Sequence, residues 1–115
     1  MPQKDRKTYR ETIKRLLRER ECLALPSLPP GLEVTCLFDD GSGQYALLTI
    51  GWMQGERVSG TTLLLRLKDG KIWIEEDETD APIAEDLVQV GIPHQDIILG
   101  FQPPEMRVYT AFAAA

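Results

Sequence analysis

The 115-residue sequence has few of the residues that usually carry catalysis or crosslinks. It contains one histidine, His94, and two cysteines, Cys22 and Cys36. Two cysteines are too few for a metal-binding framework and allow at most one disulfide. We expect both to be small apolar side chains in a reducing compartment, with a disulfide as the minority alternative. The histidine has no serine or cysteine beside it, although triad partners need not be adjacent in sequence, and we expect it to lie exposed in a loop.

Long hydrophobic runs are also absent. No apolar segment approaches the ~20 residues that span a bilayer, and the N-terminus lacks the apolar segment of a signal peptide. We therefore expect a cytoplasmic protein without membrane contact. The nine glycines form neither a phosphate-binding loop nor a dinucleotide-binding fingerprint. The acidic segments lack the ligand spacing of a calcium loop, so the sequence predicts no cofactor and no metal.

The composition and the charge distribution indicate a folded protein with two electrostatic halves. Hydrophobic residues make up 43% and charged residues 27% of the chain, which excludes a disordered protein. The length predicts one domain over residues 1–115. Residues 1–20 hold eight bases and three acids, a net charge of +5, whereas the whole chain carries −5. The other 95 residues therefore carry −10.

A helix is predicted from about Asp5 to Leu23. Apolar residues recur there at spacings of three, four and seven, the period of one helix face: Tyr9, Ile13, Leu16, Leu17 and Leu23. Arg10, Lys14 and Arg18 form a second line, which we call the basic ridge. Prolines at positions 26, 29 and 30 end the helix.

The next forty-odd residues predict an antiparallel meander. From Leu32 to Phe38 every second residue is apolar, as expected for a strand covered on one face. Three more strands are expected, separated by segments rich in turn-forming residues: 45–52, 57–67 and 71–74. Asp69-Gly70, between the last two, is typical of a two-residue hairpin turn. The sequence thus predicts about four antiparallel strands.

An acidic segment follows the meander. Its first four residues, which we call the acidic lip, are Glu75, Glu76, Asp77 and Glu78. We expect Asp80 to cap a short helix that begins at Pro82 and ends near Gly91. After it come a one-turn connector, a loop and a docked C-terminal tail. The fold class is therefore α+β: an N-terminal helix, the meander, short C-terminal helices and the tail.

Several functions remain open on residue chemistry alone. The basic ridge could contact DNA phosphates with a strongly salt-dependent affinity, although the chain is acidic and has no recognised DNA-binding motif. The acidic lip could bind a basic protein, or its acids could serve a Mg²⁺-dependent enzyme if others converged on them. Trp52 and Trp73 lie in expected strands, where core packing or a subunit interface is favoured over base stacking.

The ordered set of motifs resembles the XisI-like proteins, the fdxN-element excision controlling factors of cyanobacteria. The resemblance covers roughly residues 8–113. It rests on these segments: Gly51-Trp52, Arg57-Val58-Ser59-Gly60, Lys68–Ile74, Ile83–Val88, Gly91-Ile92-Pro93, Asp96–Phe101, Pro104–Arg107 and Thr110–Ala113.

The resemblance implies a non-enzymatic accessory protein. It would act with an XisH-like companion to control a recombinase that excises a DNA element during heterocyst differentiation. No catalytic residue is carried over. We expect partner contacts at the basic ridge and the acidic lip. Three alternatives stay open: an acidic inhibitor of a nuclease-like partner, direct DNA binding through the basic helix, and self-association as a dimer.

Overall fold

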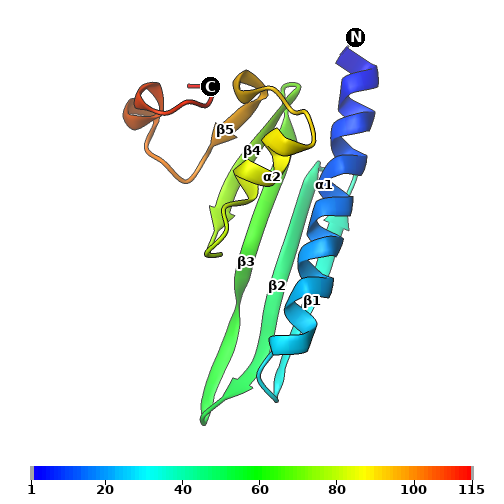
Figure 1. The fold of residues 1–115 in the computed structure, drawn as a ribbon, viewed down its shortest axis with the longest axis vertical. Coiled ribbons are helices and arrows are strands. Elements are labelled where there is room, and N and C mark those ends of the chain that lie inside the picture. The colour runs from blue at the N-terminus through cyan, green and yellow to red at the C-terminus, as the bar shows by residue number, and fades with distance from the viewer. Residues whose placement is uncertain (1, 115) are drawn as a thin grey trace.

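The computed structural model describes residues 2–114 and has an α+β fold (Figure 1). The helix α1 comes first and lies along a five-stranded sheet, and the remaining helices are short. The α-helices are α1 (Pro2–Ala24) and α2 (Ile83–Gln89), and the 3₁₀ turns are η1 (Leu25–Ser27), η2 (His94–Asp96) and η3 (Pro104–Tyr109). The strands are β1 (Leu32–Asp39), β2 (Gln44–Met53), β3 (Glu56–Lys68), β4 (Lys71–Asp77) and β5 (Ile97–Leu99).

The apolar stripe of α1 packs on the sheet as the helical period predicts. Tyr9, Ile13, Leu16 and Leu17 are all buried. The prediction is wrong for Leu23, whose side chain is 73% exposed. By that point α1 has passed the part of the sheet that α2 also covers, so this last turn borders an open groove instead of the core.

The sheet order is β1-β2-β3-β4-β5, and the first four strands form the predicted antiparallel meander. The fifth strand extends the prediction: the apolar segment Ile97–Leu99 returns after α2 and pairs in parallel with β4. A parallel neighbour needs a crossover connection, usually a helix, and α2 lies within that connection. The short helices α2 and η2 therefore form the connection that places β5 beside β4.

Two tight hairpins join the central strands. Asp69 and Gly70 have φ of +56° and +75°, and Gln54 and Gly55 have φ of +53° and +81°. Positive φ at both central residues is the mark of a type I′ turn, whose twist matches that of the flanking strands. The hairpin predicted at Asp69-Gly70 is confirmed. The turn at Gln54-Gly55 carries β2 and β3 well beyond the end of β4 (Figure 1).

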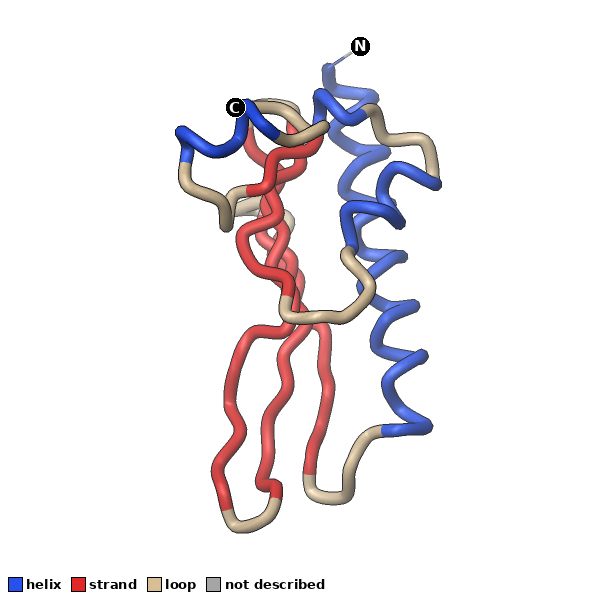
Figure 2. Tube along the Cα trace, turned by 60° about the vertical axis from the view of Figure 1, so that its left-hand side comes forward, coloured by secondary structure: helices blue, strands red, loops and turns tan. Residues whose placement is uncertain are grey.

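The helices α1 and α2 lie on one face of the sheet (Figure 2). Along β1 the burial alternates residue by residue, as the period of two predicts. The core lies between the helices and this face, around Tyr45, Leu63, Leu65, Ile72 and Ile74. Leu37 and Trp52 belong to the other face and are 62% and 57% exposed, so Trp52 is not a core residue.

Asp77, instead of the expected Asp80, holds the start of α2. The residue before α2 is Pro82, and it makes no side-chain cap. The Asp77 Oδ2 atom accepts a hydrogen bond of 2.8 Å from the Ile83 N–H. A side-chain oxygen at a helix start satisfies an amide that has no partner within the helix. The prediction failed because the chain folds back here, which brings the end of β4 closer to α2 than the adjacent aspartate.

The C-terminal tail docks through Arg107, which is only 9% exposed. Its guanidinium donates to the carbonyl oxygens of Leu99, Gly100 and Gln102 at 3.1–3.3 Å and lies 5.4 Å from the ring centroid of Trp73. The predicted docked tail is thus fixed to the end of β5. Within residues 2–114, no helix is long and apolar enough to span a membrane.

Candidate functional site

The basic ridge lies on the side of α1 that faces β1 and the loop after it. Lys14 Nζ lies 2.8 Å from Asp40 Oδ2, and Arg10 Nε lies 4.0 Å from Asp40 Oδ1. The hydrogen bond from Lys14 lowers the pKa of the Asp40 carboxyl below its usual value. Arg18 lies 3.6 Å from Glu21 and places its guanidinium 5.0 Å from the ring centroid of Phe38. All three bases therefore contact acids of their own chain.

The four residues of the acidic lip do different things. Glu75 pairs with Arg66 at 3.2 Å. Asp77 turns inward and accepts hydrogen bonds from the amides of Thr79 and Ile83 at 2.9 and 2.8 Å. Glu76 is half-buried and Glu78 is exposed. The four acids of the lip are therefore not equivalent. Asp77 fixes the local backbone, whereas Glu78 faces solvent.

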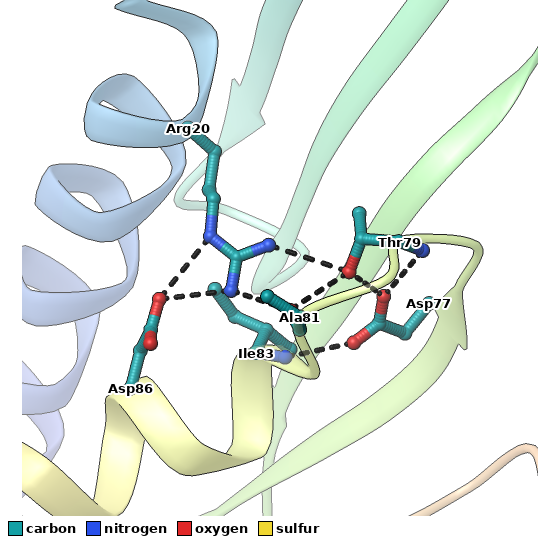
Figure 3. Close-up of polar contacts among 6 residues, drawn as sticks. All are labelled: Arg20, Asp77, Thr79, Ala81, Ile83 and Asp86. Atoms are coloured by element: carbon teal, nitrogen blue, oxygen red, sulfur yellow. Dashed lines mark hydrogen bonds and ion pairs between the residues drawn. The ribbon is translucent and has the colours of Figure 1, made fainter. Parts of the chain in front are cut away.

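A cluster centred on Arg20 joins α1 to the segment between β4 and α2 (Figure 3). The Arg20 side chain is 12% exposed. Its Nε and NH2 groups donate to Asp86 Oδ2 at 3.2 and 2.9 Å. It also donates to the Thr79 hydroxyl at 3.3 Å and to the Ala81 carbonyl at 2.7 Å.

The cluster continues from Arg20 into the acidic lip. The Thr79 hydroxyl, which accepts from Arg20, donates to Asp77 Oδ1. Asp77 in turn holds the start of α2 (Figure 3). Charge-assisted hydrogen bonds are the stronger ones in proteins, and arginine holds several acceptors in a fixed geometry. Arg20 therefore fixes the position of the acidic segment relative to α1.

A groove of about 490 Å³ opens beside this cluster, between the end of α1, the sheet and the residues after β4. Its apolar walls include Leu23, Leu28 and Val34. On its floor, the hydroxyls of Thr49 and Thr62 lie 2.7 Å apart. The groove thus combines an apolar wall with paired hydroxyls.

Comparison with known proteins identifies the family. The family model described as "XisI protein" matches residues 3–114. The chain belongs to the XisI family. One similar solved structure is an XisI-like protein from Anabaena variabilis, with a TM-score of 0.89 and 33% identity over 96% of this chain and 99% of that one. Another is described as the fdxN element excision controlling factor XisI from Anabaena variabilis, with a TM-score of 0.81 and 38% identity over the same shares of both chains. The search of curated proteins found no match.

In this XisI-family chain the cysteines differ in their surroundings. Both are free. Cys22 is exposed, which contradicts the expected role as a core filler, whereas Cys36 packs partly against the core. Burial and then the nearby Glu21 carboxylate raise the pKa of the Cys36 thiol to about 11, and the thiol lies 3.5 Å from Glu21 Oε1. Cys36 is therefore a weak nucleophile at neutral pH.

The histidine and the acids occupy separate places in this XisI-family chain. His94 is exposed, as predicted, and its ring centroid lies 5.2 Å from that of Phe112. Among the residues that the structure describes, no three His, Cys, Asp or Glu side chains are grouped so that they could hold a metal ion.

Arg20 was not identified from the sequence as a structural contact, although its position in α1 indicated one. Arg20 follows Leu16 and Leu17 by four and three residues, so it continues the buried stripe of α1. A charged residue on the core side of a helix is almost always paired when it is buried. The position of Arg20 on the core side of α1 could therefore have indicated a paired arginine in the folded protein.

Proposed function

We propose that this protein is a non-enzymatic accessory factor that controls excision of a DNA element by contacting a partner protein, an XisH-like companion. The observation that carries the proposal is the 38% identity, over 96% of this chain, to a protein described as the fdxN element excision controlling factor. Membership of the XisI family over residues 3–114 supports it further.

The charges of α1 favour a protein partner over direct contact with DNA. Affinity for DNA grows with the number of phosphates that lysines and arginines neutralise. Lys14 contacts Asp40 at 2.8 Å, and Arg18 contacts Glu21 at 3.6 Å. DNA would have to displace these acids or approach them closely, and the chain as a whole carries −5. Direct DNA binding is therefore the weaker candidate.

The exposed part of the acidic lip supports a basic partner surface. Glu78 is exposed, and the neighbouring Asp77 is held in place by hydrogen bonds to two backbone amides. A charge on a rigid segment contributes to electrostatic steering and to the choice of partner. The same feature supports a second candidate function, in which the protein inhibits a nuclease-like partner by covering its basic cleft.

Co-purification of the protein with an XisH-like companion tests the proposal. We expect a stable complex at micromolar concentration. We expect charge reversal at Glu76 and Glu78 to weaken it several-fold, since rim charges contribute to association. Glu105→Lys is the matched control, because Glu105 is an exposed glutamate of η3 at the C-terminal end of the chain. No complex with the wild-type protein would overturn the proposal.

Separate measurements address the other candidates. If the protein inhibits a nuclease, its co-expression relieves the toxicity of the companion, and reversal of the acidic lip removes that relief. If α1 binds DNA, Lys14→Glu abolishes a strongly salt-dependent affinity. Self-association, motivated by exposed sheet edges, predicts a dimer in sedimentation of the protein alone.

A further inference from the structure

The strand β3 has an edge that the rest of the sheet leaves open. β3 has 13 residues, but β4 pairs with it only from Leu63 onward. The Glu78 N–H donates to the Thr62 carbonyl at 2.9 Å, which marks the end of that pairing. Within residues 2–114, no strand lies on the outer side of residues 56–61, which form the lower half of β3 in Figure 1. Unpaired main-chain groups of this kind are a template for an added strand.

The register shows which groups face the open side. In a two-residue hairpin the residues that flank the turn form a hydrogen-bonded pair, and the bonding then alternates along the strands. The Trp52 N–H donates to the Gly31 carbonyl oxygen at 3.0 Å, on the β1 side, and therefore points away from β3. This direction is the one that the alternation from the hairpin turn requires for Trp52. Its partner Arg57 therefore directs its N–H and C=O outward, and the alternation extends this to Ser59 and Thr61.

The groove beside this edge leaves room for side chains of an added strand. Thr62 lies at the end of the open segment and also lines the groove. A Cβ atom built on Gly60 would meet nothing within 4 Å. Leu23, 73% exposed, and the half-buried Val34 give the groove apolar walls. An apolar side chain of an added strand opposite Gly60 would fill the open space at that glycine and lie at the near side of the groove, beside Thr49 and Thr62.

The charge at the end of the open edge is negative. Glu78 sits where β4 pairing stops, and Asp80 follows it on the rim of the groove. Both are exposed, and no residue in the described part of the chain forms an ion pair or side-chain hydrogen bond with either carboxylate. A segment that carries lysine or arginine at this end would complement them.

We infer that residues 57–61 of β3 are a docking edge for an extended segment of a partner protein. The segment adds a strand through the main-chain groups of Arg57, Ser59 and Thr61. It directs apolar side chains toward the groove and a lysine or arginine toward Glu78 and Asp80. The inference rests on the proposed function, since it specifies how the companion binds.

A second copy of this chain fits the edge poorly. If β3 paired antiparallel with β3 of a second copy through Arg57, Ser59 and Thr61, Ser59 would lie opposite Ser59 of that copy. In that register Glu56 of the second copy lies opposite Thr62, the position that Glu78 already occupies. The two acids would then repel each other, and the second hairpin would collide with the end of β4. The open edge therefore favours a different, basic strand.

Ser59→Pro tests the docking edge directly. Its outward N–H makes no bond to β2, so proline removes a donor from the open edge and leaves the hairpin paired. We expect the affinity for the companion to fall about ten-fold or more. Ser59→Ala is the matched control, because it keeps the backbone amide, and we expect it to bind like the wild type. Equal binding by all three proteins would overturn the inference.

Hydrogen exchange on the wild-type protein provides a second measurement that does not depend on the proline variant folding. Binding of the companion should slow exchange of the amides of Arg57, Ser59 and Thr61, and leave those of β1, the opposite edge, unchanged. A complex that protects β1, or neither edge, would overturn the docking edge and leave the proposed function standing. No complex at all would overturn both.

Discussion

Replacing Arg20 with alanine removes the guanidinium that joins α1 to the segment between β4 and α2. The change breaks two hydrogen bonds to Asp86 and one each to Thr79 and Ala81. Hydrogen bonds to charged groups contribute about 1.5–3 kcal/mol when buried. The Asp86 side chain is 39% exposed, so solvent screening reduces its share to ~1 kcal/mol or less. With the two neutral acceptors included, we expect a loss of about 2 kcal/mol in the free energy of unfolding.

Urea denaturation followed by circular dichroism measures this loss, and calorimetry should show a Tm lower by roughly 6–10 °C. Arg15→Ala is the matched control on the same helix. The Arg15 side chain is 58% exposed and lies 3.9 Å from Glu19, so its loss should cost no more than about 0.5 kcal/mol. If Arg20→Ala destabilises the protein no more than Arg15→Ala does, the cluster does not hold the acidic segment and the reasoning is refuted.

Three further predictions follow from single contacts. Asp77→Ala should lower the free energy of unfolding by about 1–2 kcal/mol in urea denaturation, because it removes the acceptor for the first amide of α2. Gly51→Ala should prevent folding or lower the Tm sharply, because φ is +146° and the added Cβ would clash with the carbonyl oxygen of Gly31. Iodoacetamide at pH 8 should alkylate Cys22 before Cys36, and the rate at Cys36 should keep rising with pH toward its pKa of about 11.

Each of these predictions has an internal comparison. Asp80→Ala controls for Asp77→Ala, since Asp80 was the expected cap and makes no cap contact; an equal loss at Asp80 would contradict the assignment. Gly55→Ala controls for Gly51→Ala, because the added Cβ at Gly55 meets no atom within 4 Å. Its cost should be only about 1 kcal/mol from the positive φ. Mass spectrometry of the alkylated peptides would refute the third prediction if Cys36 reacted first.

The parts of the fold that were predicted correctly depend on local sequence. The stripe of α1 follows from a repeat within twenty residues, and the hairpin at Asp69-Gly70 follows from two residues that readily adopt positive φ. The alternation along β1 follows from one strand having one covered face. In each case the determining residues are neighbours in sequence, so the pattern is visible without the tertiary structure.

The parts that were missed depend on contacts between distant segments. β5 has only three residues, and its pairing with β4 is set by where α2 returns the chain. Asp77 replaces Asp80 as the acceptor at α2 because the loop folds back on itself. The partners of Arg20 lie 59–66 residues away. Periodicity carries no information about such pairs, and therefore only the buried position of Arg20 could have indicated that a partner was required.

The charge asymmetry of the chain acquires a different meaning once the contacts are known. Three bases in the second half of α1 are paired within the chain: Lys14 contacts Asp40, Arg18 contacts Glu21 and Arg20 contacts Asp86. Glu78 and Asp80 instead face solvent at the end of the open β3 edge. The charge available to a partner at this edge is thus negative, although the N-terminal twenty residues are basic. Added salt should therefore weaken the binding of a basic segment at the β3 edge. The substitution Lys14→Glu lies on the side of α1 that faces β1, away from this edge, and should leave that binding unchanged.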